Sequence, residues 1–297
     1  MLVNPFTITN FMKNTLRIAI QKSGRLSDQS LQLINECGIH FNNGKRRLKA
    51  VSPNFPAEFL FLRDDDIPGY VEDGIADLGI VGENEMVEKA KNVSLIKRLG
   101  FSKCRLSLAI PRDKAYDDPT YFQGKNIATS YPRILNQYLE EKALTAQIHE
   151  ISGSVEIAPS IGLADAVCDI VSSGSTLLSN GLKEVETIFR SEAVLLGNYQ
   201  ASQEKKDLID QLVFRINSVQ AGKGNKYILL NAPEDSTELI VSLLPGMRSP
   251  TIVPLAMRGW NSIHSVVQED QFWDVIEKLR EAGAEGILVV PIEKMIL

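Results

Sequence analysis

A hydroxyl-rich turn at residues 172–176 is the segment of this sequence best suited to chemistry. Its members are Ser172, Ser173, Gly174, Ser175 and Thr176. The apolar run 166–171 before it is expected to form a buried strand that carries Asp169. Converging N–H groups and hydroxyls bind phosphate without a lysine, and a carboxylate accepts hydrogen bonds from ribose hydroxyls. The segment therefore favours a sugar phosphate, although a turn that caps a helix from Leu177 onward fits equally well.

A second candidate loop, Lys22, Ser23, Gly24 and Arg25, directly follows the apolar strand expected at residues 16–20. Open α/β sheets bind ligands at this end of their strands. Lys22 and Arg25 are suited to neutralising phosphate oxygens, and arginine offers a two-pronged contact. A solvated loop with two surface charges is the alternative. GxGxxG and GxxxxGK[ST] patterns are both absent, which argues against a dinucleotide-binding or P-loop enzyme.

Two further turns contribute candidate residues. Tyr131 follows the strand expected at 126–129 and is suited to stacking on a base or bonding a phosphate, whereas a helix that starts around Pro132 is the alternative. Glu156 is a candidate third acid of the site. The acids at 64–66 are suited to Mg²⁺, but their place at the start of a helix favours an interaction with the helix dipole.

Composition limits the class of protein. The 297 residues suggest two or three domains, and a net charge of −5 argues against nucleic acid as the main partner. The three cysteines and three histidines show no metal-ligand spacing, so a reducing cytoplasmic location is expected. No apolar run is long enough to span a membrane. Residues 1–14 lack the pattern of a signal peptide and are expected to be a frayed extension, unless translation starts at Met12.

Strands and helices alternate along the chain, which predicts an α/β fold with a largely parallel sheet. The segment 74–84 is similar to 162–174: in both, a helix ends at a glycine, a strand carries an aspartate, and a glycine-containing turn follows. This internal repeat predicts two like lobes that face each other across a cleft. A helix with apolar residues at 208–216 follows, and residues 222–225 (Gly-Lys-Gly-Asn) are the expected domain boundary.

The remaining residues form a compact βαββαβ pattern. Strands are expected at 226–231, 251–257, 263–267 and 286–291, with helices at 236–244 and 271–282. This order is that of a ferredoxin-like unit. The unit holds no evident catalytic constellation, so effector binding and dimerisation are both compatible with it.

Taken in order, several segments resemble the long form of ATP phosphoribosyltransferase. They are KSGRL (22–26), RDDDIP (63–68), DLGIVGEN (77–84), CRLSLA (104–109), IATSYP (127–132), DIVSSGSTL (169–177), RSPTI (248–252) and PIEKM (291–295). The resemblance runs from about residue 15 to the C-terminus. Residues 222–225 depart from the more charged linker typical of the family, which leaves contacts between the domains in question rather than the chemistry.

The resemblance implies a two-lobed catalytic core like a type II periplasmic binding protein, followed by a ferredoxin-like regulatory domain. Lobe 1 would comprise residues 1–107 and 193–221, lobe 2 residues 108–192, and the regulatory domain residues 222–297. The implied reaction joins ATP to phosphoribosyl pyrophosphate, giving N1-(5-phosphoribosyl)-ATP and pyrophosphate in the first step of histidine biosynthesis. Histidine would inhibit the enzyme, and dimers would assemble into hexamers.

The resemblance also implies roles for individual residues. Asp169 would hold the ribose hydroxyls, and the turn 172–176 would hold the 5-phosphate. Lys22 and Arg25 match the phosphate- and nucleotide-contacting first loop, and Tyr131 and Glu156 match other positions of the cleft. Mg²⁺ would be held mainly by substrate oxygens. Thr251 matches the segment near the effector.

Two other functions remain open. A non-catalytic two-lobed receptor for a small solute is the main alternative, but a secreted receptor is expected to carry a signal peptide. A phosphoribosyltransferase that acts on a free base is the second. The loop with Lys22 and Arg25 and the C-terminal unit disfavour it.

Overall fold

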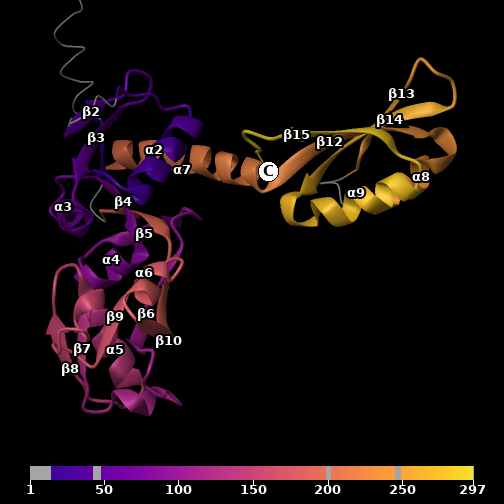
Figure 1. The fold of residues 1–297 in the computed structure, drawn as a ribbon. Helices are drawn as coiled ribbons and strands as arrows, with labels where there is room; N and C mark the ends of the chain where they lie inside the picture. Colours follow the sequence, from indigo (N-terminus) through magenta and orange to yellow (C-terminus); the bar gives the residue numbers. More distant parts are fainter. Residues whose placement is uncertain (1–14, 43–47, 199–201, 245–248, 297) are drawn as a thin grey trace, which may run out of the picture. The chain divides into compact units, whose positions relative to one another are not determined.

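The computed structural model describes residues 15–42, 48–198, 202–244 and 249–296, so the N-terminal extension considered above lies outside the described residues (Figure 1). It divides into two compact units. Unit 1 comprises Met1–Gln32 with Ile39–Leu208, and unit 2 comprises Leu33–Gly38 with Ile209–Leu297. The boundary falls inside a long helix, α7 (Gln203–Lys223). The division into two lobes and a regulatory domain at the residues given above stays a prediction.

The first sheet of unit 1 has the strand order β2-β3-β1-β4-β11-β5. Its strands are β1 (Leu16–Gln21), β2 (Lys49–Val51), β3 (Ala57–Leu62), β4 (Leu78–Gly82), β5 (Ser94–Arg98) and β11 (Ala193–Gly197). β3 and β4 run parallel to β1, whereas β11 runs antiparallel to both β4 and β5. The associated helices are α2 (Arg25–Glu36), α3 (Ile67–Glu72) and α4 (Glu83–Lys89), and a 3₁₀ turn spans Asp64–Asp66.

The second sheet of unit 1 has the order β10-β6-β9-β7-β8. Its strands are β6 (Cys104–Pro111), β7 (Asn126–Thr129), β8 (Gln147–Glu150), β9 (Ala166–Val171) and β10 (Leu182–Ser191). β8 and β9 run parallel to β7, and β6 runs antiparallel to β9 and β10. Helices α5 (Pro132–Glu141) and α6 (Ser175–Ser179) and 3₁₀ turns at Pro119–Phe122 and Val155–Ile157 complete this part.

The two sheets share one topology, so the repeat expected from the sequence is present in the fold. Apart from the additional edge strand β2, the order β3-β1-β4-β11-β5 in the first sheet corresponds to β8-β7-β9-β6-β10 in the second. In both, three parallel strands are followed by an antiparallel strand, β11 or β6, which the chain enters after it has crossed from the other sheet. The edge strand β5 or β10 comes last. Strands β4 and β9 are therefore equivalent, and the two repeated segments lead into them.

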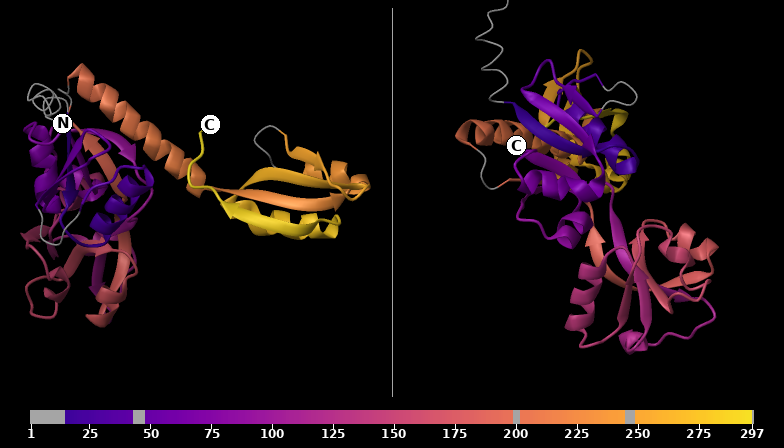
Figure 2. Two further views of the ribbon diagram at one scale, coloured as in Figure 1. Left: turned by 90° about the horizontal axis from the view of Figure 1, so that it is seen from above. Right: turned by 90° about the vertical axis from the view of Figure 1, so that its left-hand side faces the viewer.

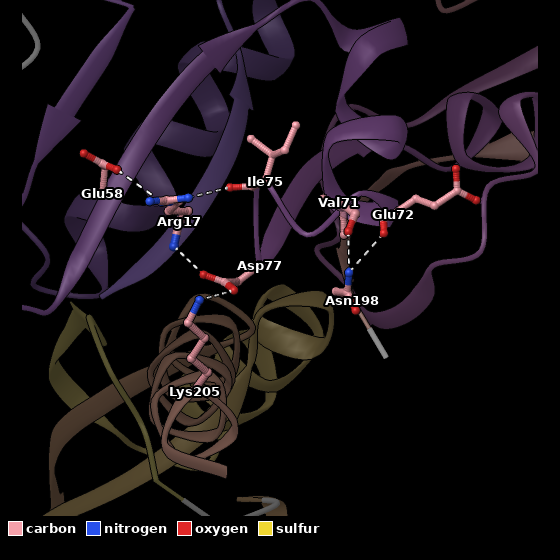
Figure 3. Close-up of polar contacts among 8 residues, drawn as sticks. All are labelled: Arg17, Glu58, Val71, Glu72, Ile75, Asp77, Asn198 and Lys205. Carbon is pink, nitrogen blue, oxygen red and sulfur yellow. Dashed lines mark hydrogen bonds and ion pairs between the residues drawn. The ribbon is translucent and has the colours of Figure 1, made fainter. Parts of the chain in front are cut away.

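The repeated aspartates explain part of this similarity. Asp77 accepts a hydrogen bond from the Arg17 N–H at 2.8 Å, and Asp165 accepts one from the Asn126 N–H at 2.9 Å. Each aspartate thus holds the start of the parallel neighbour strand, β1 or β7. Asp77 also bonds Lys205 of α7 at 2.6 Å (Figure 3). Its side chain is 9% exposed, so this ion pair is largely withdrawn from water.

Both sheets bury apolar side chains against their helices. On the first sheet, the helix α3 contributes Ile67 and Val71 to a core that also contains Val81 and Leu196. On the second sheet, α5 is amphipathic, and its buried side chains are Ile134, Leu135, Tyr138 and Leu139. The turn Val155–Ile157 and helix α6 cover a separate cluster around Val167 and Val171. The helical periodicity of the sequence thus accounts for which helix faces are buried.

Two chain crossings join the sheets. Residues 99–103 connect β5 to β6, and Glu192 connects β10 to β11. The crossings are bonded to each other, because the Leu99 N–H donates to the Ala193 carbonyl at 2.8 Å and the Ala193 N–H to the Phe101 carbonyl at 2.9 Å. This paired junction lies beside the carboxyl end of β4.

Unit 2 contains the predicted βαββαβ unit. Its elements are β12 (Asn225–Pro233), α8 (Thr237–Leu243), β13 (Thr251–Pro254), β14 (Trp260–Gln268), α9 (Phe272–Glu281) and β15 (Glu285–Pro291). The antiparallel order β13-β14-β12-β15 is that of a ferredoxin-like fold. Both helices pack on one face of the sheet, around Ile228, Leu230, Ile240 and Leu279. The yellow helix α9 is visible against that face in Figure 2.

Several element boundaries differ from the sequence expectation. Helix α6 begins at Ser175 rather than at Leu177. Helix α7 continues through Gly222. A Cβ atom at Gly222 would lie 2.7 Å from the Ile292 carbonyl oxygen. This glycine therefore permits a close approach of two chain segments, and the expected break occurs two residues later. Among the described residues, no helix is long and apolar enough to cross a bilayer.

Candidate active site

A cavity of about 280 Å³ lies where the strand ends of unit 1 meet. Its lining residues are Gln21, Arg25, Leu26, Asp64, Gly82, Asn84, Glu85, Ser102, Lys103, Cys104, Tyr131, Ile170 and Ser172. They come from the carboxyl ends of β1, β4 and β9, from the turns that follow β3 and β7, from the starts of α2 and α4, and from the crossing that enters β6. The carboxyl ends of parallel strands are the usual ligand-binding edge of open α/β sheets.

A buried polar cluster forms one wall of this cavity. The Asn84 side-chain amide donates to the Tyr131 hydroxyl oxygen at 3.3 Å and to Glu85 at 3.3 Å. On its other side, Asn84 accepts a hydrogen bond from the Ser191 hydroxyl at 2.8 Å. All four side chains belong to residues that are at most 9% exposed. The cluster links α4, the start of α5 and the end of β10, and it brings both sheets to the cavity.

Burial controls the protonation of the cluster. Desolvation raises the pKa of Glu85, a hydrogen bond with Tyr131 opposes this, and the nearby Asp64 adds to the rise. Desolvation and the charge of Glu85 also raise the pKa of Tyr131 far above its usual range. Tyr131 is therefore a neutral phenol at physiological pH. It can donate a hydrogen bond but has no tendency to ionise.

Positive charge comes from Arg25 and Lys103, both of which are exposed residues of the lining. Arg25 is close enough to Cys104 to lower the pKa of its thiol, but desolvation of that half-buried thiol is the larger effect, and the net pKa is raised. The cavity therefore combines cations at an open rim with carboxylates and neutral donors at a buried wall. Such a combination suits a ligand that has an anionic part and an uncharged polar part.

The hydroxyl-rich turn sits at the end of β9 next to this cavity. Gly174 has a φ of 82°, a left-handed conformation that favours glycine, and is the N-cap of α6. The Ser173 and Ser175 hydroxyls lie 3.0 Å apart. The first N–H groups of a helix have no intrahelical acceptor, so the N–H groups of Thr176 and Leu177 point out of the start of α6. The hydroxyl-rich turn therefore leads directly into the start of α6, as the helix-cap alternative predicts.

Asp169 stands just before the turn, with its Oδ1 atom accepting the Ile170 N–H at 2.8 Å. Desolvation raises the pKa of the Asp169 carboxyl, that hydrogen bond opposes the rise, and the negative charge of Glu156 adds to it. Asp169 in turn contributes to the raised pKa of Tyr131. Asp169, Glu156 and Tyr131 therefore share one electrostatic environment, although they lie up to 38 residues apart in the sequence.

Of the residues proposed from sequence, Arg25, Tyr131 and Ser172 line the cavity. Asp169 and Glu156 do not line it: the charge of Asp169 raises the pKa of the lining residue Tyr131, and the charge of Glu156 raises that of Asp169. Lys22, Ser23 and Gly24 are exposed in the loop before α2. Ser173, Gly174, Ser175 and Thr176 continue the turn away from Ser172. Thr251 is an exposed residue of β13 in unit 2, opposite His264 on β14.

The cavity also contains residues that the sequence did not place there, namely Gln21, Asp64, Asn84, Glu85 and Lys103. The internal repeat contains the signal that identifies Asn84 and Glu85. They follow β4 as the turn 172–176 follows β9, so the repeat places both segments at equivalent strand ends. Lys103 has no such signal, because only the crossing between the sheets brings it to the rim.

Two sheets of matching order, joined by two crossings around a polar cavity, define a two-lobed α/β protein of the type II periplasmic-binding-protein class, here with a ferredoxin-like domain. The family model described as ATP phosphoribosyltransferase matches residues 63–218, and the model described as HisG, C-terminal domain matches residues 222–294. The chain belongs to the ATP phosphoribosyltransferase family and is a pentosyltransferase. By its family name, it serves the first step of histidine biosynthesis.

Individual relatives agree with this membership. The chain is 59% identical over 285 residues to an ATP phosphoribosyltransferase of Cytophaga hutchinsonii, covering 96% of this chain and 100% of the relative. It is 58% identical over 282 residues to that of Parabacteroides distasonis, covering 95% and 100%. A solved structure, the ATP phosphoribosyl transferase (HisG:HisZ) complex from Thermotoga maritima, aligns with a TM-score of 0.58 at 28% identity, covering 68% of this chain and 98% of the solved chain.

Proposed function

We propose that this enzyme condenses ATP with phosphoribosyl pyrophosphate to give N1-(5-phosphoribosyl)-ATP and pyrophosphate. Nitrogen 1 of the adenine attacks the anomeric carbon, and the bond from that carbon to the pyrophosphate oxygen breaks. The single observation that carries the proposal is the convergence of Arg25, Tyr131 and Ser172 on one cavity in a chain of this family. The cavity offers cations, hydroxyls and buried carboxylates to two anionic substrates.

The phosphoribosyl end is proposed to bind at the end of β9. The 5-phosphate would accept hydrogen bonds from the N–H groups and hydroxyls of residues 172–176, with the helix α6 starting directly behind it. The Asp169 carboxylate would accept hydrogen bonds from the two ribose hydroxyls. This assignment is supported by the left-handed Gly174, which turns the chain so that the start of α6 faces the turn.

The nucleotide is proposed to bind on the other side of the cavity. Arg25, with Lys22 in the same loop, would contact phosphate oxygens, and Tyr131 and Glu156 would contact the nucleoside. Lys103 adds a cation to the same rim. These contacts hold two substrates in line, which is the main contribution expected for a displacement that needs no side-chain nucleophile.

Negative charge develops on the leaving pyrophosphate in this reaction, so cations close to it would stabilise the transition state. Mg²⁺ is proposed as the cofactor, and it would neutralise the pyrophosphate oxygens. Among the described residues, no three His, Cys, Asp or Glu side chains are grouped as a metal site. The proposed metal ion would arrive on substrate oxygens, and the carboxylates that line the cavity beside it are those of Asp64 and Glu85.

Regulation is proposed to reside in the C-terminal unit, with histidine as feedback inhibitor and Thr251 near the effector. Thr251 faces His264 across two antiparallel strands, and Ser262 and Tyr227 bond that histidine at 3.0 Å each. A polar, hydrogen-bonded sheet surface of this kind supports recognition of a small zwitterion. The dimer-to-hexamer assembly and the cytoplasmic location are proposed with it, and the three free cysteines support the latter.

The test is incubation of the full chain with ATP, phosphoribosyl pyrophosphate and Mg²⁺, with and without histidine, while the modified adenine is followed by its ultraviolet absorbance. Folded protein that forms no product would refute the proposed reaction. Calorimetry with phosphoribosyl pyrophosphate, amino acids and oxyanions would identify a non-catalytic receptor instead. Free bases offered in place of ATP would identify a different phosphoribosyltransferase.

A further inference from the structure

Helix α5 begins without a cap of its own. Its first residue is Pro132, which has no N–H, and its N-cap residue, Tyr131, makes no side-chain cap hydrogen bond. The next two N–H groups, of Arg133 and Ile134, donate to the two carboxylate oxygens of Glu88 at 2.9 and 3.0 Å. Glu88 lies in α4, 45 residues earlier. One carboxylate from the segment after β4 thus caps a helix of the second sheet.

The face of α4 that carries Glu88 is turned toward the second sheet. Asn84, Val87 and Glu88 are spaced by three and four residues and so share one face of the helix. Val87 packs against the apolar core of the second sheet, and Asn84 bonds the Tyr131 hydroxyl. Helix α4 therefore holds the start of α5 at two polar points, with an apolar contact between them.

This arrangement explains why a tyrosine occupies the N-cap position. N-caps favour Ser, Thr, Asp or Asn, whose short side chains bond the first N–H groups of the helix. Because Glu88 performs that task from outside, residue 131 is free to direct a long side chain into the cavity. Glu88 itself does not line the cavity. It lines a separate open groove of about 700 Å³ with Arg133, Asn136 and Glu140.

We propose that Glu88 is a positioning residue for phosphoribosyl transfer, because it fixes the start of α5 and thereby holds Tyr131 at the cavity. The inference rests on the proposed function for its effect on turnover, but the geometry that it describes is independent of the reaction. A misplacement of about 1 Å by a residue remote from the chemistry costs up to roughly a hundredfold in rate. Removal of the cap is therefore expected to lower kcat/KM by about tenfold or more.

The central variant is Glu88→Gln in the full chain, because it keeps the shape and removes the charge and one of the two acceptor oxygens. The matched control is Glu140→Gln, which removes the same charge from the same groove on the exposed side of α5. Glu88→Asp keeps the carboxylate and is expected to recover part of the lost activity. Kinetic constants are measured for both substrates, and Glu140→Gln is expected to match the wild type.

A double-mutant cycle with Tyr131→Phe separates positioning from a general loss of stability. If Glu88 acts through the Tyr131 hydroxyl, the tenfold loss caused by Glu88→Gln shrinks to about twofold or less in the Tyr131→Phe background. A residue that only stabilises the fold would give the same loss in both backgrounds. Equal effects of Glu88→Gln and Glu140→Gln, or wild-type kinetics in Glu88→Gln, would also overturn the proposal.

A measurement that does not depend on enzymatic turnover distinguishes the test of Glu88 from the test of the proposed reaction. The chain has seven tyrosines, and in fluorotyrosine-labelled protein the ¹⁹F resonance of Tyr131 is identified by its loss in Tyr131→Phe. In Glu88→Gln this resonance is expected to move toward the solvent-exposed value, while the amides of Arg133 and Ile134 exchange faster. An inactive wild-type enzyme with these shifts would refute only the reaction. An active enzyme with an unmoved resonance would refute only the role of Glu88.

Discussion

Asp77 and Asp165 occupy equivalent positions of the repeat, but only one of them is buried, so they form a matched pair for measuring what burial adds. Asp77→Ala removes the acceptor for the Arg17 N–H at 2.8 Å and the partner of Lys205 at 2.6 Å. Asp165→Ala removes the acceptor for the Asn126 N–H at 2.9 Å and a 3.8 Å pair with Lys125. The topology around both is the same.

The expected costs differ because of exposure. Hydrogen bonds to charged groups contribute about 1.5–3 kcal/mol to the free energy of unfolding, whereas exposed ion pairs contribute about 0–1 kcal/mol. The Asp77 side chain is 9% exposed and that of Asp165 is 40% exposed. Loss of Asp77 should thus cost about 3 kcal/mol, and loss of Asp165 about 1 kcal/mol. Asp77→Asn, which keeps an acceptor for the Arg17 N–H, should cost less than Asp77→Ala.

The assay must report on unit 1, because both tryptophans, Trp260 and Trp273, lie in unit 2. Amide hydrogen exchange of β1 and β4 provides that signal, since core strands exchange by unfolding of the unit. A difference of about 2 kcal/mol between the two alanine variants corresponds to roughly thirtyfold faster exchange in Asp77→Ala. Equal exchange rates in both variants, or faster exchange in Asp165→Ala, would refute the reasoning from burial.

Three further predictions follow from named contacts. Asp169→Asn should raise the KM for phosphoribosyl pyrophosphate about tenfold with little change in Tm. The charge of Glu156 raises the pKa of Asp169, so Glu156→Gln should move the acidic limb of the pH profile of kcat/KM to lower pH. An unchanged profile in Glu156→Gln contradicts this prediction. Burial raises the pKa of Glu85 in the folded state above its unfolded value. The stability of the wild type relative to Glu85→Gln, measured by urea denaturation, should therefore increase as pH falls from 7 toward 5 and be lost as pH rises through the folded pKa. A stability difference that changes with pH in the opposite direction contradicts this prediction. Gly79→Ala would place a Cβ atom 2.5 Å from the Ile67 side chain and should lower the free energy of unfolding of unit 1 by about 1–3 kcal/mol, as measured by urea denaturation. In the control Gly69→Ala in α3, the added Cβ atom meets no atom within 4 Å, so this variant should be as stable as the wild type or more stable.

The elements of the fold were predictable where a local signal decides them. Short apolar runs identified β1, β4 and β9, and the helical spacing of apolar residues identified α7. The strand neighbours were not predictable in the same way. β11 joins the first sheet and β6 the second only after the chain has crossed between them, and no local pattern records a crossing. The sequence feature that came closest to predicting the strand neighbours is the repeated Gly-x-x-Asp segment, because Asp77 and Asp165 accept equivalent backbone hydrogen bonds in the two sheets.

The residues of the candidate site were likewise predictable only where a local sequence pattern marks them. Arg25 and Ser172, which line the cavity, were predicted because a cation and a hydroxyl-rich turn with a glycine each directly follow a strand. Asn84 and Glu85 were not, since their role depends on contacts with Tyr131 and Ser191 that lie 47 and 107 residues away. The capping role of Glu88 was even less predictable, because in the sequence Glu88 is one of several acidic residues on a short polar helix. A helix start at Pro132 was expected, but no local pattern records that its first N–H groups bond a carboxylate 45 and 46 residues away.

The protonation states of the three cysteines and of Tyr131 limit how this enzyme can accelerate its reaction. Burial raises the pKa of Cys37 to about 11 and raises those of Cys104 and Cys168 as well, so all three thiols are neutral at physiological pH. Tyr131 is likewise held neutral. Because thiolates rather than thiols are nucleophiles, none of these groups is poised for covalent catalysis. In the proposed reaction, the rate enhancement would then come from holding two anionic substrates in line and from cations near the leaving group, and the proposed positioning of Tyr131 by Glu88 would contribute to it.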